Sequence, residues 1–413
     1  MRNSGLLWIL MAIMLLMDIY IFQVVKSLTH SVSPRARLII TIVYWLVSVA
    51  GLGVMLAIPY LNEQNISRSV RTYLFAIVVG LFFSKIIATA FFAVDDIRRG
   101  ITWLVTRIKG PAPEVGTGDG ITRSAFLSWL GFGLGGGLMA TLVYGFTNKY
   151  NYQVVRKKLK YDNVPAAFKG LKIVHISDIH SGSFTDKNAV QRGVEKIMNE
   201  KPDLILFTGD LVNDRATEMD DYMEVFSKLS APMGIYSTLG NHDYGDYVVW
   251  ESAEIKRSNL ERLKEIHGEL GWRLLMNEHV PLEKNGEKIA LIGIENWSAK
   301  GNFPKYGRLD EAYKGSEDIG FKILMSHDPS HWVAEVQEKY MDIDLMLAGH
   351  THGMQFGVEI PGFRWSPVQY MYKQWAGLYE NNNQKLYVNR GFGFIGYPGR
   401  VGILPEITVL ELV

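Results

Sequence analysis

Four long apolar runs occupy the first 150 residues and constrain the possible folds more than any other feature. They cover residues 5–25, 38–61, 70–94 and 125–147. An α-helix needs about 20 apolar residues to cross a bilayer, and four such runs leave too little polar surface for a soluble helical domain. The sequence therefore predicts an all-α bundle of four transmembrane helices in a membrane domain at 1–150. The first run has no small-residue cleavage site, so we expect a span rather than a removed signal peptide.

The segments around the third and fourth runs predict how the bundle packs and meets the bilayer surface. Residues 97–110 interleave Arg and Lys with Ile, Trp, Leu and Val. This pattern favours a basic amphipathic loop that forms a helix lying at the interface or, alternatively, an ordinary soluble loop helix. Residues 110–120 are rich in Gly and Pro and predict a flexible connector. The glycines at 131–137 predict close packing of the fourth helix against a neighbour.

Two charged residues lie inside the apolar runs. Asp18 is in the first run and Lys85 is in the third. Charges within membrane spans are candidates for function and often pair with each other. The alternative is that each side chain extends to the interface from a shorter span.

The basic residues near the spans predict the orientation of the chain. They are equally divided between the two sides, but residues that precede a large translocated domain count for less. The cluster Arg98, Arg99, Arg107 and Lys109 then favours a cytoplasmic position for the loop after the third run. We expect a multi-pass protein of a bacterial inner or plasma membrane, with its C-terminal domain outside the cytoplasm.

Residues 151–413 have a different composition and predict a second domain. Residues 1–150 carry a net charge of +7, whereas 151–413 carry −6 and have about twice the density of charged side chains. The total of +1 gives no reason to expect nucleic acid as a partner. The absence of cysteine excludes disulfides, iron–sulfur clusters and thiolate zinc sites. Apolar strand-like segments alternate with helical ones, which indicates an α/β fold.

Five of the predicted strands end in possible metal ligands. The carboxyl ends of neighbouring strands gather in one crevice, and residues two apart in an extended segment share a face. Glycines precede several of these residues and allow sharp turns and close backbone approach. The seven candidates are Asp178, His180, Asp210, Asn241, His327, His350 and His352. Mixed imidazole and carboxylate ligands suit Mn, Fe or Zn, and seven ligands fit two divalent ions that share one carboxylate.

The strand ends, read in order as SDIH, FTGD, LGNHD, SHD and AGHTHG, resemble the calcineurin-like metallophosphoesterase superfamily. The final 25 residues resemble its membrane-associated or exported branch. The resemblance covers about 170–413 and implies a four-layer α-β-β-α sandwich. It also implies two divalent metal ions as cofactors, with Mn the first expectation.

The resemblance further implies a role for each residue of the site. Asp178, His180 and His352 would hold the first metal, Asp210 would bridge, and Asn241, His327 and His350 would hold the second. His242 would be the catalytic histidine beside the leaving group, oriented by Asp243. Arg390, Arg400 and Asn213 would bind substrate; the alternative for the two arginines is an ordinary surface position.

These features predict a membrane-anchored phosphoesterase that hydrolyses a phosphoester or pyrophosphate bond. Anchoring beside a bilayer favours a lipid or lipid-linked substrate, with a UDP-diacylglucosamine-type pyrophosphate as one candidate. The lipid bilayer is then a partner, and the oligomeric state is open. The alternative is a non-catalytic membrane sensor or scaffold that carries a metal-binding domain.

Two further groups of residues have alternative interpretations. His175 has the wrong strand parity for the site and should face away from it, while His267, His279 and His331 are expected at the surface. Residues 360–379 are rich in aromatic side chains. They predict either a strand pair packed in the core or a lip that dips towards the membrane through Trp365 and Trp375.

Overall fold

The computed structural model describes residues 4–60, 66–110, 122–301 and 303–413. It divides into two compact units, Met1–Tyr144 and Gly145–Val413. We call the first the helical unit and the second the sandwich unit.

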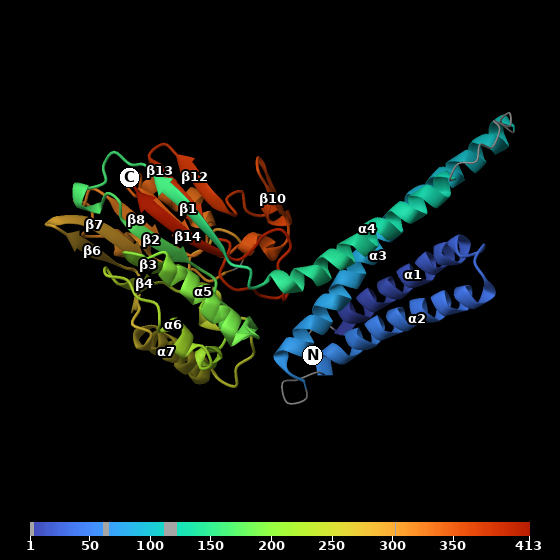
Figure 1. The fold of residues 1–413 in the computed structure, drawn as a ribbon, viewed down its shortest axis with the longest axis horizontal. Coiled ribbons are helices and arrows are strands. Elements are labelled where there is room, and N and C mark those ends of the chain that lie inside the picture. The colour runs from blue at the N-terminus through green and yellow to red at the C-terminus, as the bar shows by residue number, and fades with distance from the viewer. Residues whose placement is uncertain (1–3, 61–65, 111–121, 302) are drawn as a thin grey trace. The chain divides into compact units, whose positions relative to one another are not determined.

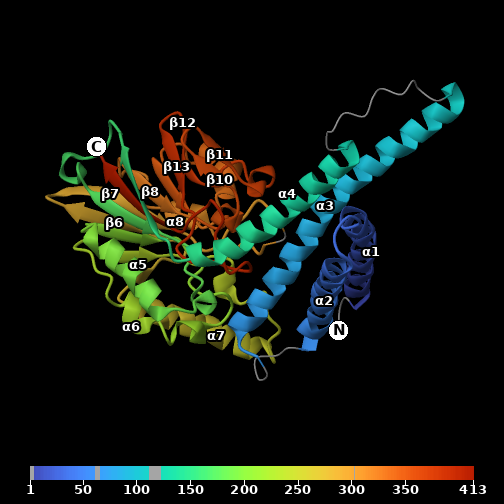
Figure 2. The ribbon, with the colours of Figure 1, turned by 45° about the vertical axis from the view of Figure 1, so that its right-hand side comes forward.

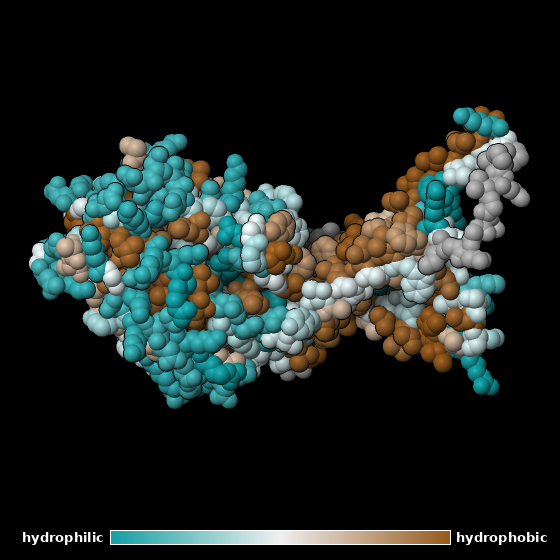
Figure 3. All heavy atoms as spheres, turned by 45° about the horizontal axis from the view of Figure 1, so that its top comes forward, coloured by the Kyte–Doolittle hydropathy of each residue, from teal (hydrophilic) through white to brown (hydrophobic). Residues whose placement is uncertain are grey.

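Four long helices form the helical unit: α1 (Ser4–Leu28), α2 (Pro34–Ala57), α3 (Arg68–Lys109) and α4 (Arg123–Gly145). Ser33 caps α2 through the Ala36 N–H and precedes a proline at the first turn. Within the described residues all four helices have the length and hydropathy of membrane spans. Figure 3 shows the contrast in hydropathy between these helices and the more polar sandwich unit. The prediction of four apolar helices is confirmed.

The basic segment 97–110 is helical over 97–109, as expected, but it is not a separate element, because it continues α3 without a break (Figure 2). Arg98 pairs with Asp95 at 2.8 Å, and Arg99 pairs with both Asp95 and Asp96. Such pairs three or four residues apart support a helix across the predicted break. The single Gly100 weakens the helix too little to end it. The predicted connector falls almost entirely on residues 111–121, which lie outside the described part of the chain.

Glycines and one ion pair determine how the helices pack. A Cβ atom at Gly135 would lie 2.7 Å from the Ser84 carbonyl oxygen, so α4 approaches α3 as closely as the glycines predict. Lys85 Nζ lies 2.7 Å from Asp18 Oδ1. Ser48 donates a hydrogen bond of 2.8 Å to the same oxygen, and Tyr44 donates one of 2.7 Å to the Asp18 carbonyl. The pairing interpretation of Asp18 and Lys85 is therefore confirmed.

Two six-stranded sheets form the centre of the sandwich unit (Figure 1). The first sheet has the order β1 (Gln153–Leu159), β14 (Glu406–Leu412), β2 (Lys172–Ile176), β3 (Leu204–Phe207), β4 (Ile235–Ser237) and β5 (Arg273–Leu274). The second has the order β12 (Gly377–Asn381), β13 (Gln384–Val388), β9 (Leu345–Ala348), β8 (Lys322–Met325), β7 (Glu287–Gly293) and β6 (Glu278–Lys284).

Three hydrophobic cores show that the unit has four layers. One core lies between the two sheets and includes Leu206 and Leu347. A second joins the first sheet to α5 (Lys187–Asn199), α6 (Met223–Phe226) and α7 (Ala253–Glu269). The third joins the second sheet to α8 (Leu309–Tyr313) and to the π-helical turn Trp332–Val336 that precedes α9 (Gln337–Lys339). The predicted α-β-β-α sandwich is confirmed.

Strand direction places the candidate ligands at one edge of the sandwich. Strands β2, β3 and β4 run parallel in the first sheet, and β7, β8 and β9 run parallel in the second. The loops that leave the carboxyl ends of β2, β3, β4, β8 and β9 carry all seven predicted ligands. The fold therefore brings together residues that are up to 174 positions apart in the sequence.

Candidate metal centre

Asp178, His180 and His352 form the first cluster of possible ligands. The Nε2 atoms of His180 and His352 lie 3.0 Å apart, and Asp178 Oδ1 lies 3.1 Å from His352 Nε2. All three side chains are buried. Two of these residues follow β2 and the third follows β9, so the cluster joins the two sheets.

Asp210, His327 and His350 form the second cluster. Asp210 Oδ2 lies 3.1 Å from His327 Nε2, and Asn241 Oδ1 lies 2.8 Å from His350 Nδ1. The same Asp210 oxygen lies 3.5 Å from His180 Nε2 of the first cluster. One carboxylate oxygen therefore faces both groups of histidines.

The donor atoms fit divalent metal ions. His327 Nδ1 lies 2.7 Å from the Thr208 carbonyl, which orients the ring and directs Nε2 into the cluster. The facing ring nitrogens of His180 and His352 can both contact one cation once each presents its lone pair. Imidazole and carboxylate donors together suit first-row transition metals.

The backbone at the ligands adopts a conformation that side chains rarely take. The left-handed residues include five ligands: Asp178, His180, Asp210, His350 and His352, with φ between 48° and 69°. A non-glycine residue in this region carries a cost of about 1–3 kcal/mol, and such strain clusters at functional sites. Glycine also permits the close approach that the sequence indicated. A Cβ at Gly349 would lie 2.1 Å from Asp178 Oδ2, and one at Gly240 would lie 2.2 Å from Asp210 Oδ1.

The electrostatics of the two clusters favour cation binding. Burial alone would raise the pKa of the Asp178 carboxyl, but the His352 and His327 imidazoles hold it well below its usual range. Burial alone would lower the pKa of His327, but Asp210 and Asp178 raise it to about 10. The carboxylates are thus ionised in a buried site and require positive charge beside them.

His242 lies beside the clusters and is held by the backbone. Its Nδ1 lies 2.8 Å from the Asn213 carbonyl, its ring centroid is 4.4 Å from that of Tyr247, and its centroid is 5.0 Å from that of His180. With Nδ1 occupied, Nε2 is the nitrogen available to a substrate. The position matches a histidine that contacts substrate and does not ligate metal.

Asp243 has a different partner from the one predicted. Its buried carboxylate accepts hydrogen bonds of 2.8 Å from the N–H groups of Asp210, Leu211 and Gly240. Burial, with the nearby Asp210 carboxylate, raises its pKa to about 7. Asp243 therefore ties the Asp210 loop to the Asn241 loop, and the orientation of His242 comes from the Asn213 carbonyl. The sequence spacing could not distinguish these roles because adjacent side chains can point in opposite directions.

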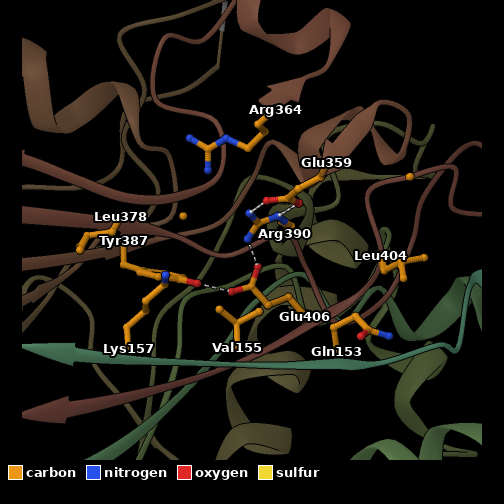
Figure 4. A pocket seen from close by; sticks show the side chains of 12 residues that line it. Gln153, Val155, Lys157, Glu359, Arg364, Leu378, Tyr387, Arg390, Leu404 and Glu406 are labelled. Carbon is orange, nitrogen blue, oxygen red and sulfur yellow. Dashed lines mark hydrogen bonds and ion pairs between the residues drawn. The ribbon is translucent and has the colours of Figure 1, made fainter. Parts of the chain in front are cut away.

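The structure places the three predicted substrate-binding residues in internal contacts. Arg390 is buried between Glu359 and Glu406 and forms an ion pair with each (Figure 4). Arg400 is fully buried and donates to backbone carbonyls, including that of Arg390 at 2.7 Å. The Asn213 amide bonds to Ser183 at 3.0 Å. This placement does not support their predicted contact with substrate, and chain position alone could not reveal the direction of these side chains.

The remaining histidines are distributed differently from the prediction. His175 is buried, and its Nε2 lies 2.9 Å from the Thr208 hydroxyl. It faces away from the clusters, as expected. The predicted surface positions of His267 and His331 are wrong, because both side chains are fully buried. His267 packs near Phe207, and His331 Nδ1 lies 3.0 Å from Ser326 Oγ. His279 is half-buried.

Three aromatic residues lie at the site although the sequence did not predict them there. Tyr372 OH lies 3.0 Å from His350 Nε2, the Phe303 ring centroid is 5.4 Å from that of His350, and the Tyr247 ring packs against His242 at a tilt of 37°. They come from three separate loops, and no spacing in the chain links them. Of the three, only Tyr372 belongs to a segment that the sequence singled out.

Two family models match the chain. Residues 171–354 match the model "Calcineurin-like phosphoesterase". Residues 1–149 match the model "Probable Calcineurin-like phosphoesterase, transmembrane domain". The first model contains all seven candidate ligands and His242, and the second contains the four long helices.

Three similar proteins carry metallophosphoesterase or phosphodiesterase names. The transmembrane protein with metallophosphoesterase domain of Danio rerio is 29% identical over 278 residues, covering 65% of this chain and 60% of that protein. The uncharacterized metallophosphoesterase YkuE of Bacillus subtilis is 29% identical over 284 residues, covering 67% of this chain and 92% of that protein. The phosphodiesterase YaeI of Escherichia coli is 27% identical over 266 residues, covering 63% of this chain and 88% of that protein.

The chain spans under two thirds of the Danio rerio protein but most of the two bacterial ones. The two family models account for both units of the fold, and the ligand clusters lie within the phosphoesterase match. The chain therefore belongs to the calcineurin-like metallophosphoesterase superfamily, in the membrane-associated branch that joins this domain to four transmembrane helices.

Proposed function

We propose that the protein is a membrane-anchored phosphoesterase that uses two divalent metal ions. The observation that carries this proposal is the position of Asp210 Oδ2, which lies 3.1 Å from His327 Nε2 and 3.5 Å from His180 Nε2. A carboxylate between two imidazole clusters is suited to bridge two ions. Manganese is the first expectation, and iron or zinc would also suit these donors.

Each group in the site has a role in this proposal. Asp178, His180 and His352 would hold one ion, and Asn241, His327 and His350 the other, with Asp210 bridging. The ions would activate water and polarise the phosphoryl oxygens. His242 Nδ1–H donates to the Asn213 carbonyl, so Nε2 is the ring nitrogen left for proton transfer. That nitrogen would donate its proton to the leaving oxygen.

A phosphodiester or pyrophosphate of a lipid or lipid-linked molecule is the proposed substrate class. The name phosphodiesterase carried by YaeI supports the type of bond. The four apolar helices support a substrate that lies in a bilayer. Tyr247 and Phe303 offer apolar ring surface beside His242 and His350, where an acylated leaving group could pack. A UDP-diacylglucosamine-type pyrophosphate remains one candidate within this class.

Activity assays of the full chain in lipid nanodiscs test this function. With Mn²⁺ supplied, we expect hydrolysis of a lipid phosphodiester or pyrophosphate, and weaker hydrolysis of a small soluble diester. An Asp210→Asn variant is the inactive control. If the protein binds metal but cleaves none of a broad panel of phosphoesters, the alternative of a non-catalytic sensor or scaffold is favoured.

The proposed location of the site is outside the cytoplasm of a bacterial inner or plasma membrane. The basis is the basic cluster Arg98, Arg99, Arg107 and Lys109. A reporter that is active only in the cytoplasm, fused after Val413, should be inactive. Strong activity of that reporter would reverse the orientation and leave the proposed chemistry unchanged.

A further inference from the structure

A short hairpin stands apart from both large sheets of the sandwich unit. Strands β10 (Val358–Ile360) and β11 (Phe363–Trp365) pair only with each other among the described strands. Pro361 and Gly362 form the turn, and Gly362 has φ +79°, as a Pro-Gly turn requires. The label β10 marks this hairpin in Figure 1.

Large apolar side chains are exposed on this hairpin and on the turn η9 (Pro367–Tyr370) that follows it. The exposed fractions are 42% for Val358, 57% for Ile360, 54% for Phe363, 78% for Tyr370 and 58% for Met371. We call these five residues the hairpin surface. Ile360 and Phe363 face each other across the strand pair, and Tyr370 OH lies 3.5 Å from the Trp365 indole nitrogen of β11. Clustered exposed apolar groups mark interaction sites.

The hairpin surface rests on a well-packed support. The Arg364 guanidinium lies 5.0 Å from the Trp375 ring centroid, and Trp375 is only 4% exposed. Ser366 donates a hydrogen bond of 2.8 Å to the Gly353 carbonyl, next to the ligand His352. Trp375 is therefore buried against the segment and helps to hold it in place. This corrects the expectation that Trp375 would dip towards a membrane. Trp365 is half-buried.

The charges around the hairpin surface suit a bilayer. Glu359, the one acidic residue in 358–373, forms an ion pair with Arg390. Lys373 is exposed two residues after Met371. A paired carboxylate avoids repulsion from anionic lipid headgroups, and an exposed lysine beside aromatic and aliphatic side chains is attracted to them.

The hairpin begins beside the point where the chain arrives from the last transmembrane helix. Gly145, the final residue of α4, accepts a 2.9 Å hydrogen bond from the Arg400 N–H. Val401 pairs with Phe356 and accepts a 2.9 Å hydrogen bond from the Gly357 N–H. Residue 358 then begins β10. The loop 400–401 thus lies between Gly145, the first residue of the sandwich unit, and the base of the hairpin.

We propose that the hairpin surface inserts into the interface of the same bilayer that holds α1–α4. The chain enters the sandwich unit at Gly145, and the hairpin, whose base contacts the same loop 400–401, presents apolar side chains. Amphipathic elements of this kind bury their apolar face about 5–10 Å into the headgroup and acyl boundary. The ligand His352 lies three residues before Gln355, whose amide bonds to the same loop at Gly399 (3.1 Å). Insertion would bring the metal centre close to the membrane surface.

Site-specific labelling can test the insertion directly, because the natural chain contains no cysteine. Phe363→Cys and Met371→Cys would each carry an environment-sensitive fluorophore in the full chain, in nanodiscs containing anionic lipid. Met341→Cys is the matched control: Met341 is 73% exposed and lies before β9, at the opposite end of that strand from the ligands. Lipids with brominated acyl chains should quench the labels at 363 and 371 and leave the label at 341 bright.

Equal quenching at 363, 371 and 341 would overturn the proposal. The proposal would also be overturned if the labels at 363 and 371 were shielded from solvent only at concentrations where the chain dimerises. A second copy of the chain would then cover the hairpin surface. Quenching should be unchanged in the Asp210→Asn background. The inference therefore survives if the proposed function fails, and its own failure leaves the metal chemistry untouched. Unchanged melting temperatures of the labelled variants would exclude misfolding.

Discussion

The two units of the protein bury charged side chains in opposite ways. In the helical unit, the Asp18 carboxylate meets the Lys85 ammonium at 2.7 Å and a serine hydroxyl, so protein groups neutralise it. In the sandwich unit, Asp178 and Asp210 lie among histidines whose ring nitrogens face each other. The first arrangement pairs opposite charges within the chain, whereas the second gains most from added cations. The same residue types thus hold a bundle together in one unit and form a candidate reaction site in the other.

The largest effect is expected at the carboxylate that faces both clusters. Asp210→Asn removes the negative charge shared by the two proposed ions, so metal content and turnover should both fall to background. Metal analysis and activity of the purified chain measure this. Asp18→Asn, which changes the same residue type in the helical unit, should leave metal content unchanged. Two bound metals and full activity in Asp210→Asn would refute the bridging role.

His242 should affect the rate without affecting the metals. Its ring is held by the Asn213 carbonyl and not by the clusters, so His242→Ala should lower the rate by ~10²–10⁴ with normal metal content. Tyr247→Phe is the control, because it keeps the ring beside His242 and removes only the hydroxyl that accepts from Asn241. The control should lose only about fivefold, as for one hydrogen bond. Parallel loss of metal in His242→Ala would show that His242 is a ligand.

Removing one partner of the buried pair should destabilise only the helical unit. Lys85→Met leaves the fully buried Asp18 carboxylate without its counter-ion, which costs about 3–5 kcal/mol. The double variant Asp18→Asn with Lys85→Met should recover much of that loss. Thermal unfolding in detergent measures both, and hydrolysis of a soluble diester should stay near wild type. If the single variant is as stable as wild type, the pair does not hold the bundle.

The smallest effect concerns acid sensitivity of the sandwich unit. Burial lowers the pKa of His267 to about 3, against about 6.5 when unfolded. The unfolded chain therefore binds more protons between these values, and stability falls as pH drops below about 6.5, by at most ~1.4 kcal/mol per pH unit. His267→Leu should reduce this slope, as measured by denaturant unfolding between pH 4 and 7. His279→Leu, at a half-buried position, is the comparison; an unchanged slope in His267→Leu would contradict the assignment.

Patterns local in the chain determined most of the fold. Each transmembrane helix is a continuous apolar run, and the bilayer length requirement acts on that run alone. The ligands were predictable because each follows an apolar strand, and parallel strands bring their carboxyl ends to one edge. Asp178, Asp210 and His350 therefore came together in the structure as their positions in the chain indicated.

Tertiary structure decided the directions and partners of individual side chains. The sequence placed Asp243 next to His242, but its carboxylate turns to the Asp210 and Gly240 N–H groups because those loops converge there. The sequence also marked Arg390 and Arg400, but Glu406 of β14 pairs with Arg390, and backbone carbonyls accept hydrogen bonds from Arg400. His267 is buried because α7 turns that face towards Phe207. Chain spacing sets which elements form, whereas long-range packing sets which atoms meet, and only the latter determines what a side chain can bind.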